Sequence, residues 1–266
     1  MQNSVLVQGP IKRNVSFVSM KRVLLLILLS AFSAFSQTKP TKSEAAAAPK
    51  APATPVAAPA KPVRAAKYEV LYGSKPLSKA DQKELNEFVA SCDASFGSRA
   101  EAVTFFAERA WEYVASAHLD TATYRFNLIS ALDSNSVDAY WGLGVISFQR
   151  GDNDLAIRLL NKGLELDSTQ SMMRVDYAIV KLSCYEKGQD CGTLDEVETE
   201  LKHALAQDPK NANAWMKRCQ VAYYKENYEL AWTYFHEARM ADILQLDLNF
   251  GSLLAAKMPD PKGIFK

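Results

Sequence analysis

Two cysteines close together are the clearest candidates for chemistry in this chain. Cys184 and Cys191 bracket the segment Cys-Tyr-Glu-Lys-Gly-Gln-Asp-Cys. Neighbouring cysteines in a loop pair readily in an oxidising compartment, so we expect a disulfide between them. A metal site is the rival interpretation. However, His203 is the only histidine nearby in sequence, and the spacing matches no zinc pattern.

The remaining cysteines and histidines show no spacing that points to a reaction. Cys92 and Cys219 fall on predicted buried faces, where a free cysteine behaves as a small hydrophobe. We therefore expect packed thiols at both positions. The three histidines, His118, His203 and His236, are expected on the solvated surface.

Catalytic motifs are missing from the sequence. We find no nucleophile elbow, no glycine-rich phosphate loop and no paired His-Glu metal motif. The run Gly-Asp-Asn-Asp at 151–154 is acidic, but it lacks the distal glutamate of a calcium loop. The sequence thus predicts a protein that is not an enzyme and that needs neither a cofactor nor a metal.

Composition and charge are those of an ordinary globular domain. The chain has 266 residues, 48% of them hydrophobic, and a formal net charge of +1. This near-neutral charge indicates neither a nucleic-acid-binding surface nor a membrane-binding surface. The charge of the chain therefore indicates no class of partner. We expect the protein to bind neither nucleic acid nor a small-molecule substrate.

A secretory signal peptide is predicted near the front of the chain. Met20 is followed by Lys21 and Arg22, an apolar run and the small-residue end Ala-Phe-Ser at 34–36. We expect the true start at Met20 and cleavage between Ser36 and Gln37, in a bacterial protein exported to the periplasm or cell envelope. An uncleaved anchor is the alternative, but the apolar core is shorter than the roughly 20 residues that span a bilayer.

The segment after the cleavage point is biased in composition. It is almost entirely Ala, Pro, Lys and Thr, with prolines at Pro40, Pro49, Pro52, Pro55, Pro59 and Pro62. Such a sequence cannot bury a core, and its prolines favour extended backbone. It predicts a disordered tether, which acts as a spacer or as a basic arm that contacts the cell wall.

The body of the chain repeats with a period of about 34 residues, which is typical of helix-turn-helix repeats. In the clearest segment, 137–170, small residues at Gly144, Ala156 and Gly163 let two helices approach closely, while Leu143 and Leu160 fill the space between them. Three further segments, 103–136, 171–211 and 212–245, align with it. Segment 171–211 is too long, and its surplus lies near 186–193.

These positions resemble the consensus of the tetratricopeptide repeat (TPR) family. The resemblance implies an all-α fold, a helix-turn-helix solenoid of about four TPR-like repeats. Helices at both ends would cap it, because a terminal repeat cannot leave its apolar face exposed. Ser78 and Ser98, each followed three residues later by an acidic residue, resemble capping boxes that begin helices. The expected order is 1–36 extension and signal peptide, 37–66 linker, 67–102 extended segment and capping helix, 103–245 repeats, and 246–266 capping helix and tail.

In this family the first helix of each repeat lines a groove that takes a peptide or a partner helix. Carried over place by place, the residues expected to form the partner-binding groove are Trp111, Trp141, Val145, Phe148, Ile179, Met216, Gln220, Tyr223 and Tyr224. The family's Lys, Asn and Arg set for a terminal carboxylate is missing, so the groove is expected to be apolar and aromatic. Packing within the protein is the alternative role for each aromatic, and segment 68–73 is a candidate to occupy the groove itself.

The sequence therefore predicts a protein that binds other proteins. We expect a scaffold or adaptor in the cell envelope that holds a peptide or partner helix. The alternative is a structural protein attached to the cell wall through its basic, proline-rich linker.

Overall fold

The computed structural model describes residues 65–265, all of which lie in one structural unit. Short turns connect the α-helices of this region. In chain order the helices are α1 (Lys79–Ser95), α2 (Arg99–Ala115), α3 (Leu119–Leu132), α4 (Val137–Gln149), α5 (Asn153–Leu166), α6 (Ser171–Glu186), α7 (Leu194–Gln207), α8 (Ala212–Tyr224), α9 (Tyr228–Ala241) and α10 (Leu248–Lys257). Three short 3-10 helices complete the structure: η1 (Ala66–Tyr68), η2 (Val70–Ser74) and η3 (Ile243–Gln245). The predicted signal peptide and linker lie outside the described residues.

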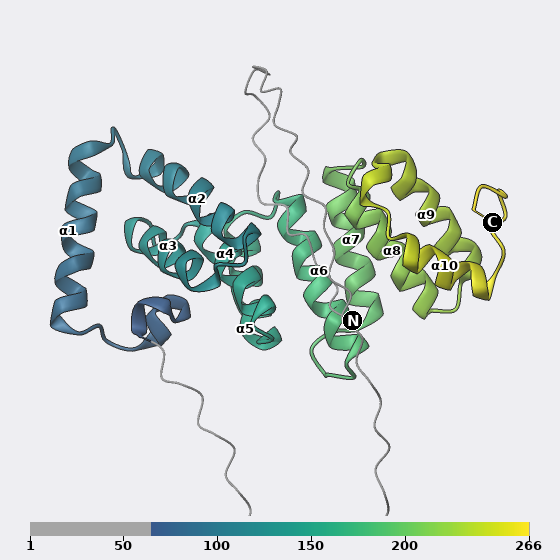
Figure 1. Ribbon diagram of the computed structural model, residues 1–266, viewed down its shortest axis with the longest axis horizontal. Helices are drawn as coiled ribbons and strands as arrows, with labels where there is room; N and C mark the ends of the chain where they lie inside the picture. The colour runs from purple at the N-terminus through teal and green to yellow at the C-terminus, as the bar shows by residue number, and fades with distance from the viewer. Residues whose placement is uncertain (1–64, 266) are drawn as a thin grey trace, which may run out of the picture. The chain divides into compact units, whose positions relative to one another are not determined.

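The helices pack in adjacent pairs, α2 with α3, α4 with α5, α6 with α7 and α8 with α9 (Figure 1). Each pair also contacts the next pair along the chain. The all-α repeat fold predicted from the sequence is therefore confirmed. Within residues 65–265, no helix combines the length and hydrophobicity required to cross a membrane.

Repeats 1 to 4 are the pairs α2/α3, α4/α5, α6/α7 and α8/α9. Glycines of α4 allow close approach both to α5 within repeat 2 and to α3 of repeat 1. A Cβ atom on Gly144 would lie 2.8 Å from Cγ of Leu160, and one on Gly142 would lie 2.1 Å from the ring of Phe126. No real Cβ tolerates such contacts, so a larger residue at either position would push the helices apart. The spacing of small residues in the sequence thus reports helix packing.

Polar side chains begin most helices as the sequence indicates. Oγ of Ser78 accepts a hydrogen bond from N of Asp81, and Oγ of Ser98 accepts one from N of Glu101. The reciprocal second bond of a capping box forms at Thr193, at the start of α7, where Glu196 binds back to the backbone. Each cap satisfies an N–H group that the helix itself leaves unpaired.

The turn inside each repeat contains one residue with left-handed backbone conformation. These residues are Ala117 (φ 58°), Gly151 (φ 83°), Gly188 (φ 64°) and Glu226 (φ 58°). The third turn is the long one. Helix α6 has 16 residues where α4 and α8 have 13, and residues 187–193 follow it before α7 begins.

The buried side chains fall into three clusters along the array. The first joins repeats 1 and 2 and extends into α6 as far as Val180. The second fills repeat 3 and reaches α8, and the third fills repeat 4 and reaches α10. Trp141, Trp232 and Phe126 are the largest fully buried side chains. Such a divided core is typical of a repeat protein, in which each unit packs mainly on its neighbours.

The segment before α1 packs on α3, the second helix of repeat 1. The Nδ2 atom of Asn127 donates to the carbonyl oxygens of Lys67 (3.1 Å) and Glu69 (2.8 Å), and its Oδ1 accepts from N of Leu71 (2.9 Å). Segment 68–73 was predicted to be extended, but it forms 3-10 turns. A buried amide that binds three backbone groups holds these turns in place.

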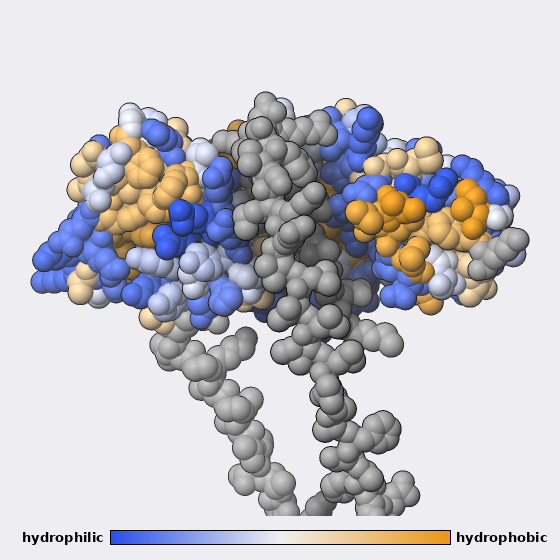
Figure 2. Space-filling view, turned by 45° about the horizontal axis from the view of Figure 1, so that its top comes forward, coloured by the Kyte–Doolittle hydropathy of each residue, from blue (hydrophilic) through white to orange (hydrophobic). Residues whose placement is uncertain are grey.

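The C-terminal tail folds back on α9. Asp260 accepts hydrogen bonds from the backbone N–H groups of Lys262, Ile264 and Phe265 and from Nε2 of His236. The ring of Phe265 packs against Trp232 and Phe235. The tail and α10 together cap the last repeat. Exposed apolar side chains remain beside this cap, where Figure 2 shows hydrophobic surface, at Met240, Ile243, Leu244, Leu248 and Leu253.

Candidate functional site

The first helices of successive repeats contact one another and form one surface, which we call the first-helix face. Helix α2 contacts α4, α4 contacts α6, and α6 contacts α8. The rings of Trp111 and Trp141 meet edge to face with centroids 5.1 Å apart. Nε1 of Trp141 then donates to Oδ2 of Asp176 on α6 at 2.7 Å. Side-chain contacts thus run across three repeats.

Most residues predicted to line a groove are too deeply buried to contact a ligand. Trp111 is 8% exposed, Trp141 and Val145 are 2% exposed, and Ile179 and Met216 are 5% and 3% exposed. The partly buried members of the set are Phe148, Gln220, Tyr223 and Tyr224. The apolar members therefore form the floor of the first-helix face, packed against their own protein.

Exposed positions lie at one edge of that floor. Ala115 and Gln149, at the C-terminal ends of α2 and α4, are exposed. Each is the thirteenth residue of its repeat, Ala115 in segment 103–136 and Gln149 in segment 137–170. These residues can meet a partner without any rearrangement of the core.

Asp176 is the most unusual residue of this face. Its carboxylate is partly buried and accepts the Trp141 hydrogen bond, yet no cation among the described residues pairs with it. Burial raises the pKa of Asp176 to about 7, and the Trp141 bond opposes that rise. Burying a carboxylate without a positive partner costs folding free energy. Asp176 is not among the groove residues predicted from the sequence.

Lys217 occupies the same place of the next repeat, as the sixth residue of segment 212–245, just as Asp176 is the sixth of 171–211. Its Nζ donates to Oε1 of Gln220 at 3.0 Å, and no carboxylate in residues 65–265 lies within salt-bridge distance. Burial lowers the pKa of Lys217, and the more distant carboxylates of Glu186 and Asp247 oppose the effect. Aligning the repeats by place would have shown this pair of opposite charges.

Tyrosines cover the C-terminal part of the face. The hydroxyl of Tyr224 donates to Oε1 of Glu186 at 2.8 Å, and its ring meets that of Tyr185. Tyr223 packs edge to face on Phe250 of α10, with centroids 5.2 Å apart. Both predicted groove tyrosines therefore join the last repeat to its neighbours. Burial and the Glu186 bond raise the pKa of Tyr224.

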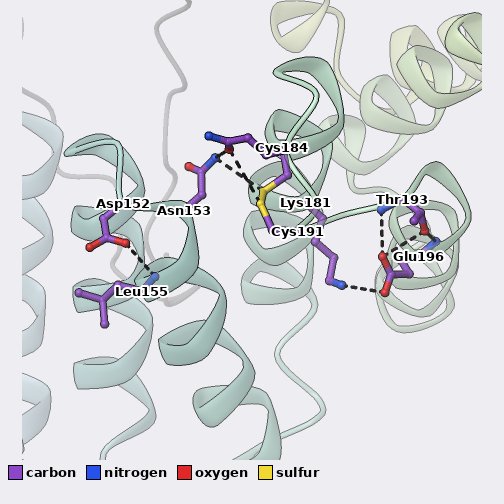
Figure 3. The surroundings of a disulfide bond; sticks show 9 residues. Asp152, Asn153, Leu155, Lys181, Cys184, Cys191, Thr193 and Glu196 are labelled. Atoms are coloured by element: carbon purple, nitrogen blue, oxygen red, sulfur yellow. Dashed lines mark hydrogen bonds and ion pairs between the residues drawn. A yellow bond between two sulfur atoms is a disulfide. The ribbon is translucent and has the colours of Figure 1, made fainter.

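A disulfide joins Cys184 and Cys191 in the long turn of repeat 3, with a Cα–Cα distance of 5.5 Å (Figure 3). Asn153, the first residue of α5, donates from Nδ2 to Oε1 of Gln189 inside the loop at 2.9 Å. The bridged loop therefore contacts repeat 2 as well as closing the turn of repeat 3. Cys92 and Cys219 are free and buried.

The prediction for His236 was wrong. Its side chain is 2% exposed, and its Nε2 lies 2.8 Å from Oδ1 of Asp260. Although burial favours the protonated form of Asp260, the backbone N–H groups of Phe265, Lys262 and Ile264, together with His236, lower its pKa to about 2. A histidine enclosed in this way positions the tail and offers no access to a substrate. His118 and His203 are exposed.

Other candidate sites in the described chain are modest. No group of His, Cys, Asp and Glu residues between 65 and 265 could hold a metal ion. A shallow hollow of about 410 Å³ lies between α7, α8 and α9, where the carboxylate of Glu198 pairs with Arg218, Lys202 and Lys225. Its charges already compensate one another. The first-helix face therefore remains the candidate site.

Comparisons with known proteins support the fold but indicate no specific function. Neither a family model nor a curated protein matches the chain. Among solved structures, the chain is similar to PilF of Pseudomonas aeruginosa, with 19% identity over 60% of this chain and 67% of that one and a TM-score of 0.50.

MamA of Desulfovibrio magneticus RS-1 is 15% identical over 63% of this chain and 90% of that one, with a TM-score of 0.48. YrrB, described as a TPR protein with an unusual peptide-binding site, is 20% identical over 65% and 86%, with a TM-score of 0.45. At these identities the similarity concerns the fold alone. The paired helices and the likeness to PilF show that the described chain is a TPR-like array of helical repeats.

Proposed function

We propose that this protein is a non-enzymatic scaffold or adaptor that holds a peptide or partner helix on its first-helix face. One observation carries the proposal: the face contains Asp176 and Lys217, two partly buried charges without ionic partners inside the described protein. Charges of this kind reduce folding stability. Binding a complementary partner would compensate them, whereas a purely structural face gains nothing from keeping them.

Two substitutions at exposed positions of the first-helix face test its role without disturbing the core. Ala115→Arg and Gln149→Arg place large cations on exposed positions of α2 and α4. Ala206→Arg and Asn161→Arg are the controls, because the first makes the same change and the second a similar amide-to-arginine change on exposed positions of second helices. A pull-down from envelope extract with the full chain should lose its partners in the face variants and retain them in the controls. Equal retention by all four variants would exclude the face.

The proposed location is the cell envelope, reached through the signal peptide ending near Ser36. A disulfide at Cys184 and Cys191 supports this proposal, because structural disulfides persist in oxidising compartments. Intact mass of the protein isolated from its native cells provides the test. A mature chain that begins at Gln37 is expected, and a chain retaining residues 20–36 would contradict cleavage.

The cell-wall alternative rests on the composition of segment 37–66 rather than on the repeats. Sedimentation of the full chain with purified wall material, in low and high salt, separates the two functions. Salt-sensitive binding that is unchanged in the Ala115→Arg and Gln149→Arg variants would favour the wall-bound structural role.

A further inference from the structure

Asp176 and Lys217 share three features that set them apart from the other charges of the repeats. Both stand at the sixth place of a repeat, on first helices that contact each other. Both are partly buried. Each makes one hydrogen bond to a neutral side chain, Asp176 with Trp141 and Lys217 with Gln220. The two charges do not pair with each other.

Neither charged group uses its full hydrogen-bonding capacity. Trp141 uses Oδ2 of Asp176, while Oδ1 has no partner among the described residues and is not among their buried unpaired atoms. An ammonium group has three donors, and Gln220 takes only one from Lys217. One free acceptor and two free donors of opposite charge thus remain on the first-helix face.

Other charges near these helices are paired. Arg174 of α6 binds Glu200, Lys181 binds Glu196, and Arg218 of α8 binds Glu198. These three pairs join first helices to second helices and stabilise the stacking of the repeats. The contrast identifies Asp176 and Lys217 as charges for which the described protein supplies a hydrogen bond but no counter-ion.

We infer that the first-helix face binds an extended segment of a partner protein that carries a basic side chain opposite Asp176 and an acidic side chain opposite Lys217, one repeat further. This inference rests on the proposed function and specifies its ligand. An ion pair with a partly desolvated charge is stronger than one on an open surface. The separation of the two ligand charges is set by adjacent repeats, which gives the site its selectivity.

The test uses a phage-displayed library of random linear peptides, selected against the full chain. Selected peptides should contain a Lys or Arg and an Asp or Glu at a constant separation. A synthetic copy of the most frequent peptide should bind roughly tenfold or more weakly to Asp176→Asn and to Lys217→Gln. Replacing the peptide's basic residue by Gln should abolish the difference between the parent protein and Asp176→Asn.

Matched controls keep the test independent of folding. Asp154→Asn and Lys162→Gln make the same chemical changes on exposed positions of α5 and should leave peptide affinity unchanged. Asn at 176 can still accept the Trp141 bond without a buried charge. Loss of binding in that variant therefore reports the charge rather than an unfolded protein.

Three results would overturn the inference, and they separate it from the proposed function. The selected peptides could lack a charge preference and still fail to bind Ala115→Arg and Gln149→Arg. The first-helix face would then be a binding face, but its ligand would differ from the one inferred. Selection of no peptide would reject the extended ligand, and the proposed function would fail with it only if the pull-down also showed no partner lost in Ala115→Arg and Gln149→Arg. Self-association of the parent chain that Asp176→Asn abolishes would replace the partner by a second copy.

Discussion

Asp176 links the stability of the protein to pH. In the folded state its pKa is about 7, against 3.8 for a free carboxyl, because burial disfavours the charged form. The folded protein therefore holds this proton more tightly than the unfolded chain does. Folding stability attributable to Asp176 falls as pH rises from about 4 to 7, and its unfavourable effect is complete above 7.

Asp176→Asn should consequently stabilise the protein at pH 8 and change little at pH 4. The two pKa values correspond to at most about 4 kcal/mol. Urea unfolding of the variant and parent at both pH values, at constant salt, measures the difference. Asp154→Asn makes the same change at an exposed position and is the control, whose effect on stability should be much smaller. Equal effects of Asp176→Asn at the two pH values would mean that the carboxylate is solvated in the folded state.

Residues whose environment is local in sequence were predictable, and those whose partners lie far away were not. The serine caps bind the first turn of their own helices, and Gly144 contacts Leu160 within one repeat, so their spacing was sufficient. The partner of His236 lies 24 residues further on, in a tail without periodicity. The depth of Trp141 depends on neighbours in two other repeats. Family resemblance gave the face of each residue but not its burial.

At the scale of single elements, the turns between paired helices contain avoidable strain. Glu226 has φ 58°, a left-handed conformation that Gly151 adopts freely in the equivalent turn of repeat 2. Glu226→Gly should stabilise the protein by about 0.5 to 1 kcal/mol, since relief of strain exceeds the added entropy of the unfolded chain. The urea midpoint reports the change.

The same substitution inside a helix provides the control for Glu226→Gly. Glu237 is exposed in the middle of α9, where glycine should cost about 1 kcal/mol. Opposite signs at the two positions are expected. Destabilisation by both substitutions would show that the left-handed residue is not strained.

The disulfide loop of repeat 3 is the second element with a measurable contribution. Replacing both Cys184 and Cys191 by Ser should lower stability by about 2 kcal/mol, because the bridge closes a short loop. Reductant should lower the stability of the parent to that of the double variant and leave the variant unchanged. Alkylation of Cys191 in the folded, unreduced parent would contradict a native bridge.

Across the whole molecule, the divided core makes stability a property of neighbouring repeats. The third cluster, which includes Trp232, Phe235 and Phe250, belongs to repeat 4 and the C-terminal cap. The first cluster lies in repeats 1 and 2 and ends in α6, so repeat 3 separates it from this region. In an array whose units contact only their neighbours, damage at one end should remain near that end.

Asp260→Ala tests this expectation through the tail. The substitution removes an acceptor of four hydrogen bonds and leaves buried His236 without its partner, which should cost roughly 2 to 4 kcal/mol. Hydrogen exchange should show faster exchange in α9 and α10, while α2 to α5 keep the protection of the parent. Asp242→Ala, at a cap beside the same helices, is a milder control that removes one bond to Leu244. Uniform loss of protection from α2 to α10 after Asp260→Ala would instead show that the repeats unfold as one cooperative unit, because a defect confined to the tail would then reach the far end of the array.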